Sequence, residues 1–168
     1  MTAPRVLVAG IGNVFLGDDG FGVEAVRRLA ACDLPPDVEV RDFGIRGMDL
    51  AFALMNAYDA AILVDAAQRG EPPGTLTLLE PRLEAGEVAL DTHGWEPLKV
   101  LALAQGMGAT LPPVYVVACE PGVLVSGPGE ASRLVDLSGP VEAAVDGAVG
   151  MVLDLLKQLG AEEVTNHA

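Results

Sequence analysis

Asp19, Asp65 and His93 are the residues of this sequence whose types and positions best suit metal chemistry. Asp19 lies in a glycine-rich segment, Asp65 ends the apolar run Ala-Ala-Ile-Leu-Val, and His93 precedes a segment with helical periodicity. One imidazole and two carboxylates form a facial ligand set that leaves coordination positions open, as catalytic or exchangeable metal sites require. These ligands suit nickel, zinc or manganese better than copper(I) or an iron–sulfur cluster.

The glycine-rich segment 10–22 resembles a dinucleotide-binding loop only in part. Phe15 stands where the third glycine of G-x-G-x-x-G is needed, so the fingerprint is broken. Asp18 and Asp19 would also repel a pyrophosphate at the N-terminus of the helix that follows. The same helix end favours an ionised carboxylate, which is the form that binds metals. We therefore expect Asp18 to cap the helix and Asp19 to be a metal ligand.

Asp65 and His93 each have a structural alternative. A carboxylate at the end of an apolar strand is costly unless it is paired or bound to metal, but Asp65 could also cap the next turn. His93 is one of two histidines, the other being His167 near the end of the chain. A single histidine is more often a surface or capping residue. The hypothesis of a metal site is stronger for the three residues together than for each alone, because ligands of open α/β sheets collect at the carboxyl ends of the strands.

Five short apolar or β-branched runs predict strands, and segments with a 3.6-residue period separate most of them. The predicted strands cover residues 5–9, 38–43, 60–64, 75–79 and 114–119, and predicted helices begin near residues 18, 48, 94 and 138. This alternation predicts an α/β fold, a three-layer α/β/α sandwich with a mostly parallel five-stranded sheet. The run 60–64 is fully apolar and should be central, whereas Thr75 and Thr77 suggest a strand nearer an edge. The second helix has one apolar face, formed by Met48, Ala51, Phe52 and Met55.

The length of 168 residues fits a single domain over residues 1–168. The last helix should stop at Gly160, which leaves residues 161–168 as a frayed tail. Apolar runs are too short to cross a bilayer and no secretory leader is recognised, so we expect a cytoplasmic protein. Cys32 and Cys119 lack CxxC spacing and are expected to be core thiols; a thiol nucleophile at Cys119 is disfavoured because no base is evident.

The net charge of −14 comes from 24 acidic and 10 basic residues. Such a surface repels phosphate backbones, so nucleic acid and anionic membranes are poor partners. It would attract cations or a basic protein surface. The alternative is that the excess of acid only keeps the protein in solution.

The segment 10–22 resembles the N-terminal signature of the hydrogenase maturation proteases, and the similarity extends over residues 6–159. These endopeptidases trim the C-terminal extension of the large subunit of nickel–iron hydrogenases. In that family an acid follows Gly-Asn-x-x-x-x-Asp, a second acid ends the third strand, and a metal-binding histidine opens a helix. The matching positions here are Asp19, Asp65 and His93.

The resemblance implies an endopeptidase that acts on a nickel–iron hydrogenase large-subunit precursor after nickel insertion. The nickel arrives with the substrate and is docked by the two acids and the histidine, so no permanently bound cofactor is expected. The glycine-rich loop after the second strand implies a substrate-binding role for Asp42, Gly44 and Gly47. The peptide bond could be cleaved through a metal-polarised carbonyl or activated water, or with Asp42 as a general base.

Three other functions compete with this hypothesis. A metallopeptidase with its own zinc would act on small peptides, but the sequence lacks H-E-x-x-H. A non-enzymatic checkpoint or assembly chaperone could bind the immature large subunit without cutting it. A nucleotide-binding α/β module is disfavoured by the acidic loop.

Overall fold

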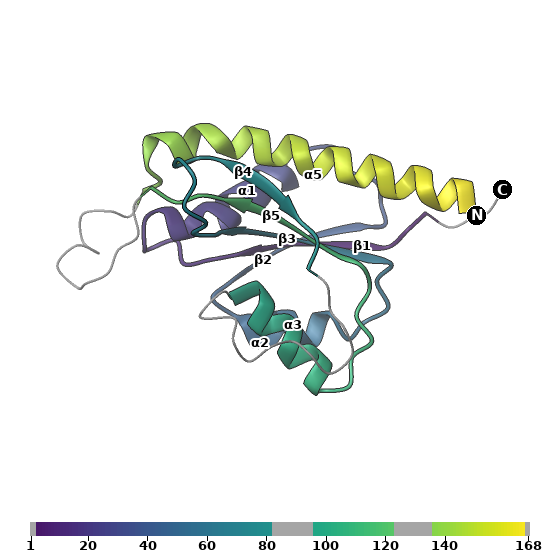
Figure 1. Ribbon diagram of the computed structural model, residues 1–168. Helices are drawn as coiled ribbons and strands as arrows, with labels where there is room; N and C mark the ends of the chain where they lie inside the picture. Colours follow the sequence, from purple (N-terminus) through teal and green to yellow (C-terminus); the bar gives the residue numbers. More distant parts are fainter. Residues whose placement is uncertain (1–2, 82–95, 123–135, 167–168) are drawn as a thin grey trace.

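The computed structural model describes residues 3–81, 96–122 and 136–166 (Figure 1). Its strands are β1 (Val6–Ile11), β2 (Val38–Gly44), β3 (Ala60–Ala66), β4 (Leu76–Leu79) and β5 (Val114–Cys119). They form one sheet in the order β2-β1-β3-β5-β4, in which only the β4–β5 pair is antiparallel among the pairings described. The predicted mostly parallel five-stranded sheet is confirmed, with β3 in the centre and β4 at an edge.

Helices cover both faces of this sheet. They are the 3₁₀ helix η1 (Asp18–Gly20), α1 (Phe21–Ala30), α2 (Gly47–Ala53), α3 (Glu96–Gly106) and α5 (Gly139–Asn166). Figure 1 shows α1 and α5 on one side of the sheet and α2 and α3 on the other, and each pair packs together. The three-layer α/β/α architecture is therefore confirmed. In the described ranges, none of the helices has an apolar stretch long enough to cross a bilayer.

Two hydrophobic cores lie on opposite faces of the sheet. Successive side chains of a strand point to opposite faces. Ile62 and Val64 of β3 accordingly pack in the core under α1 and α5, whereas Ala61 and Leu63 pack in the core under α2 and α3. By the same alternation, Asp65 belongs to the α2–α3 face.

The beginning of α1 lies directly against the ends of β1 and β3. A Cβ atom added at Gly22 would be 2.1 Å from the carbonyl oxygen of Val64 and 2.4 Å from that of Ile11. A Cβ atom at Gly10 would be 2.6 Å from the carbonyl oxygen of Gly22. Only glycine allows this approach of backbone to backbone, and the approach holds η1 beside β3.

We therefore expect Gly22→Ala to lower the free energy of unfolding by about 2–3 kcal/mol, the upper range for forcing an extra carbon into a packed core. The matched control is Gly150→Ala in α5, where an added Cβ meets nothing within 4 Å. That variant should be as stable as the parent or more stable, because alanine favours a helix over glycine. Urea denaturation of both variants measures the difference. Equal stability would contradict the close approach.

The end of α5 differs from the prediction. The helix continues through Gly160 to Asn166, so the expected stop at Gly160 is wrong. A glycine inside a helix costs only about 1 kcal/mol relative to alanine, and each further helical residue adds a backbone hydrogen bond. The next residues, Ala-Glu-Glu, have high helix propensity. The frayed tail predicted for residues 161–168 is accordingly helical up to residue 166.

The apolar face predicted for the second helix does not pack as a unit. Ala51 is fully buried, but Met48, Phe52 and Met55 are 51%, 55% and 46% exposed. The side of α2 that packs into the core carries Leu50, Ala51, Ala53 and Leu54 instead. Periodicity correctly predicts the helix, but three large apolar side chains of its predicted face lie in contact with solvent.

The two cysteines occupy different environments. Cys119 is buried, as expected, and its burial raises the pKa of the thiol to about 12, with the charges of Asp18 and Glu120 adding to the effect. The prediction of a core thiol is wrong for Cys32, which is exposed just beyond the end of α1. A buried thiol with a raised pKa is not an activated nucleophile, so the structure agrees with the low expectation of a nucleophilic Cys119.

We expect one thiol per chain to react with Ellman's reagent at pH 8 in the native protein, and two after unfolding. The reactive thiol should be Cys32, because a thiol must be both accessible and ionised to react. Cys32→Ser should abolish the native reaction, and Cys119→Ser should leave it unchanged. Rapid native labelling of Cys119 would contradict the burial described above.

Candidate active site

The loops that follow β1 and β2 are joined by their backbones. The N–H of Gly12 donates to the carbonyl oxygen of Gly44 at 2.9 Å. Gly12 has a positive φ of 138°, and a Cβ there would lie 1.8 Å from the carbonyl oxygen of Asp19. The turn after β1, the turn after β2 and η1 are therefore in direct contact at the carboxyl ends of the strands.

Asp19 is half-buried within this set of turns. Its Oδ2 accepts a hydrogen bond from the N–H of Asn13 at 2.9 Å. Asn13 in turn accepts a hydrogen bond from the N–H of Phe15 at 2.9 Å through its side-chain oxygen. The carboxylate is thus oriented by the glycine-rich segment itself.

Asp18 does not cap the helix, so that prediction is wrong. The start of α1 has no side-chain cap, and the Asp18 side chain is fully buried. Its Oδ2 accepts hydrogen bonds from the N–H of Gly122 at 2.8 Å and the hydroxyl of Ser138 at 2.7 Å, and its Oδ1 accepts from the N–H of Ser138 at 2.7 Å. Asp18 therefore ties the glycine-rich segment to the end of β5 and the start of α5.

Asp65 lies near the carboxyl end of β3 and is only 4% exposed. Its Oδ1 accepts a hydrogen bond from the N–H of Ala66 at 2.9 Å. Because η1 contacts β3, the elements that carry Asp19 and Asp65 are neighbours at the same edge of the sheet. The structure thus brings together the elements of two of the three predicted ligands.

His93 lies outside the described residues. Within residues 3–81, 96–122 and 136–166, no three histidine, cysteine, aspartate or glutamate side chains form a group that could hold a metal ion. The predicted ligand set includes one residue beyond these ranges. Its metal-binding role stays a prediction.

A cavity of about 150 Å³ opens beside these loops, on the α2–α3 face of the sheet. Both glycines predicted to bind substrate, Gly44 and Gly47, line it. Its other lining residues are Ile11, Gly12, Phe43, Ile45, Leu50 and Val100. Glycines at its wall leave backbone accessible, which suits a site that receives an extended peptide.

Asp42 does not line this cavity. Its carboxylate is 3.8 Å from the guanidinium of Arg27 on α1, and both side chains are substantially exposed. The neighbouring Phe43 packs in the core on the opposite, α2–α3 face. The loop is closed by Arg46, which donates to the carbonyl oxygens of Asp42 at 2.6 Å and Phe43 at 3.3 Å.

Glu120 is a buried acid to which the sequence assigned no role. It is 8% exposed and directly follows β5. Its two carboxylate oxygens accept hydrogen bonds from the N–H groups of Arg69 at 2.7 Å and Gly70 at 3.2 Å. Glu120 therefore holds the chain that leaves β3 beyond Asp65. An acid directly after an apolar strand is the sequence signal that could have indicated a buried, satisfied carboxylate.

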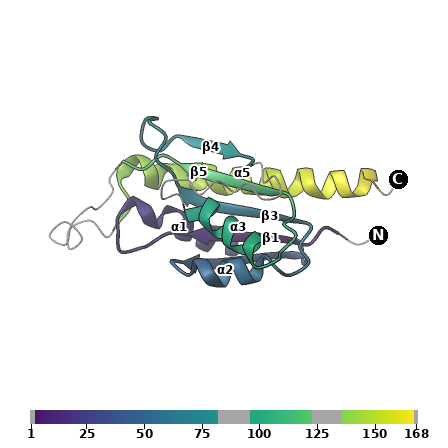
Figure 2. The ribbon, with the colours of Figure 1, turned by 60° about the horizontal axis from the view of Figure 1, so that its bottom comes forward.

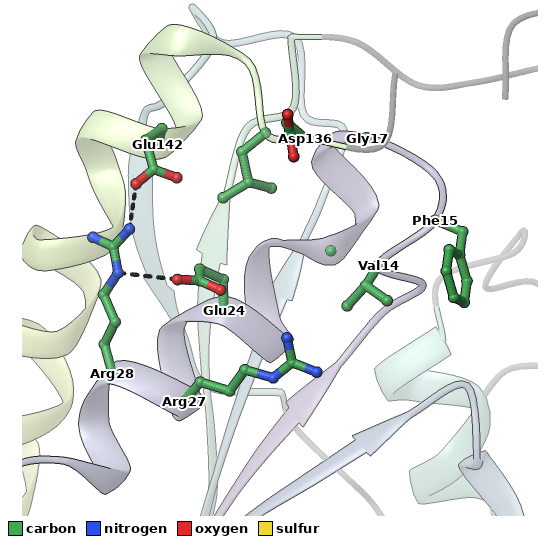
Figure 3. A pocket seen from close by; sticks show the side chains of 10 residues that line it. Val14, Phe15, Gly17, Glu24, Arg27, Arg28, Asp136 and Glu142 are labelled. Atoms are coloured by element: carbon green, nitrogen blue, oxygen red, sulfur yellow. Dashed lines mark hydrogen bonds and ion pairs between the residues drawn. The ribbon is translucent and has the colours of Figure 1, made fainter. Parts of the chain in front are cut away.

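A larger hollow of about 590 Å³ lies on the other side of the glycine-rich segment, between α1 and the start of α5 (Figure 3). Arg28 crosses it and donates to Glu24 and Asp146, both at 3.2 Å, and to Glu142. These hydrogen bonds, chiefly that of Glu142, raise the pKa of Arg28, so the guanidinium stays charged. Of the predicted site residues that the structure describes, none lines this hollow, and the ion pairs of Arg28 with Glu142 and Asp146 join α1 to α5.

A family described as hydrogenase maturation protease matches residues 23–155 of this chain. The chain belongs to the hydrogenase maturation protease family. This confirms the family and the endopeptidase class that the sequence motifs predicted.

Relatives support the assignment over nearly the full length. A hydrogenase expression/formation protein HupD of Rhizobium leguminosarum is 32% identical over 158 residues, which cover 90% of this chain and 72% of that protein. A putative hydrogenase maturation protease of Methanocaldococcus jannaschii is 31% identical over 94% of this chain and 100% of its own length. The solved hydrogenase maturating endopeptidase HybD of Escherichia coli superposes with a TM-score of 0.76 at 28% identity, covering 93% of this chain and 94% of HybD.

Proposed function

We propose that this member of the hydrogenase maturation protease family removes the C-terminal extension of a nickel–iron hydrogenase large-subunit precursor after nickel has been inserted. The observation that supports it most directly is that the turns after β1 and β2 meet beside one cavity at the carboxyl edge of the sheet, while η1 contacts both the turn after β1 and strand β3. Residues 1–168 act as one cytoplasmic peptidase domain in this proposal. No nucleic acid or membrane takes part.

The nickel belongs to the substrate, and Asp19, Asp65 and His93 dock it. Two carboxylates and one imidazole bind nickel well and leave coordination positions for the cysteines of the precursor. A precursor without nickel lacks this contact and escapes cleavage. Docking on the metal thus makes proteolysis conditional on a completed metal centre.

Two features support a place for His93 in this ligand set. His93 precedes Glu96, the first residue of α3, by three positions in the sequence. α3 contributes Val100 to the wall of the cavity beside Gly12 and Gly44. The helix that follows His93 in the sequence thus contacts the same cavity as the turns after β1 and β2.

The position of Asp42 bears on how the peptide bond is broken. Asp42 pairs with Arg27 on the α1 side of the sheet, while Asp65 belongs to the α2–α3 face with the cavity. A general base must reach the water or hydroxyl that it deprotonates. We therefore favour a carbonyl polarised by the substrate's nickel, or a water activated by it, over direct base catalysis by Asp42.

Mass spectrometry of the precursor tests the proposal. The precursor is purified with and without nickel, incubated with this protein, and weighed. Trimming of the nickel-loaded form alone is expected. Equal trimming of both forms would overturn nickel sensing, and an unchanged mass for both would overturn the protease function.

Two alternatives give distinct results in the same experiment. A non-cleaving checkpoint or assembly chaperone binds the precursor without changing its mass. A self-sufficient metallopeptidase contains stoichiometric zinc after purification, which metal analysis detects. Trimming of the nickel-loaded precursor by zinc-free protein would exclude both.

A further inference from the structure

We infer that an exposed apolar surface on α2 docks the large-subunit precursor, holding an apolar region of the substrate next to its C-terminal extension. This surface, the apolar α2 face, consists of Met48 and Phe52 of α2 together with Ile45 and Met55 from the turns at its two ends. The inference rests on the proposed function and adds the place where the body of the substrate binds. α2 lies on the outside of the molecule beside α3, as Figure 2 shows.

The four side chains of the apolar α2 face are about half exposed or more, so they are not part of the hydrophobic core. Ile45 is 76% exposed, Met48 51%, Phe52 55% and Met55 46%. Met48 and Phe52 are four residues apart within α2 and therefore lie on one side of the helix. Met55 follows in the turn at the end of α2, where its N–H donates to the carbonyl oxygen of Phe52, and Ile45 lies in the turn before α2. The opposite side, with Leu50 and Leu54, is buried. Grouped apolar side chains on a surface mark interaction sites, whereas single ones do not.

The apolar α2 face is continuous with the cavity beside the proposed active site. Ile45 lines the cavity together with Gly12, Gly44 and Gly47. Gly12 contacts the backbone of Asp19, so the wall of the cavity adjoins the segment that carries this proposed nickel ligand. A substrate that covers α2 is therefore positioned to place its tail in the cavity.

The chemistry of the apolar α2 face favours an apolar protein partner. The charges at the start of α2 pair with each other, because the guanidinium of Arg46, the residue before α2, is 3.6 Å from the carboxylate of Asp49. Methionines adapt to different partner shapes, and a partly exposed phenylalanine can anchor in a pocket of the partner. A second copy of this chain fits less well, because each copy has a net charge of −14 and two copies repel each other.

Binding of the nickel-loaded precursor to immobilised protein tests this surface. Phe52→Glu should weaken binding at least about tenfold, as loss of a central apolar anchor does. In cleavage assays the same variant should raise KM and leave kcat at saturating precursor within about twofold. Leu78→Glu is the matched control, because Leu78 is 41% exposed on edge strand β4, at the far edge of the sheet from β2, and should bind like the parent. Circular dichroism checks that each variant is folded.

The outcomes separate this inference from the proposed function. Parent-like binding by both Phe52→Glu and the second variant, Met55→Glu, would overturn the docking surface while cleavage by the parent still supported the protease. A parent that binds the precursor through Phe52 without cutting it would support docking and overturn proteolysis. A dimer in sedimentation that Phe52→Glu dissociates would assign the surface to a second copy and overturn the inference.

Discussion

Asp65→Asn should reduce cleavage of the nickel-loaded precursor by about 10²–10³-fold while the protein remains folded. Asparagine has nearly the same shape and keeps an oxygen for the N–H of Ala66, which the Asp65 carboxylate accepts at 2.9 Å. It lacks the negative charge that a hard ligand position on nickel needs, and the loss of one such electrostatic contact in a buried site costs rate in this range. Mass spectrometry over time gives the rate.

The control for Asp65→Asn is Asp33→Asn, which removes the same charge from an exposed position beyond α1. It should cleave like the parent. His93→Ala tests the third ligand independently and should have an effect as large as that of Asp65→Asn. Normal cleavage by either variant would remove that residue from the site, and loss of helical signal in Asp65→Asn would assign the residue a structural role instead.

Local pattern was enough to predict the sheet and the edge at which the candidate site lies. The fully apolar run before Asp65 predicts a strand buried on both faces, and β3 is the centre of the sheet. The threonines of 75–79 predict exposure, and β4 is an edge strand. The rule that parallel strands end at one edge then predicts the neighbourhood of Asp19 and Asp65.

The local sequence pattern could not predict contacts between residues that are far apart in the chain. Asp18 looks like a helix cap in the sequence, yet its partners Gly122 and Ser138 are 104 and 120 residues away. Glu120 binds backbone about 50 residues earlier. The periodicity around Phe52 predicts a helix with an apolar face, but it cannot show whether that face meets the core or solvent, because exposure depends on how α2 lies against the sheet.

Asp18→Ala should lower the free energy of unfolding by about 3–5 kcal/mol. The substitution removes a fully buried carboxylate and leaves two backbone N–H groups and one hydroxyl without their acceptor. Loss of one partner from a buried, charged hydrogen-bond network has this magnitude. Urea denaturation followed by circular dichroism measures the change.

Ser138→Ala provides the matched control for Asp18→Ala. It removes only the hydroxyl and keeps the Ser138 N–H, so Asp18 retains its hydrogen bonds from the N–H groups of Gly122 and Ser138. We expect a cost of about 1 kcal/mol for this single bond. Because both variants lose the same hydroxyl bond, the double variant should be less destabilised than the sum of the two single ones. Additive effects, or an Asp18→Ala variant as stable as the parent, would show that Asp18 does not hold the ends of β5 and α5 to the glycine-rich segment.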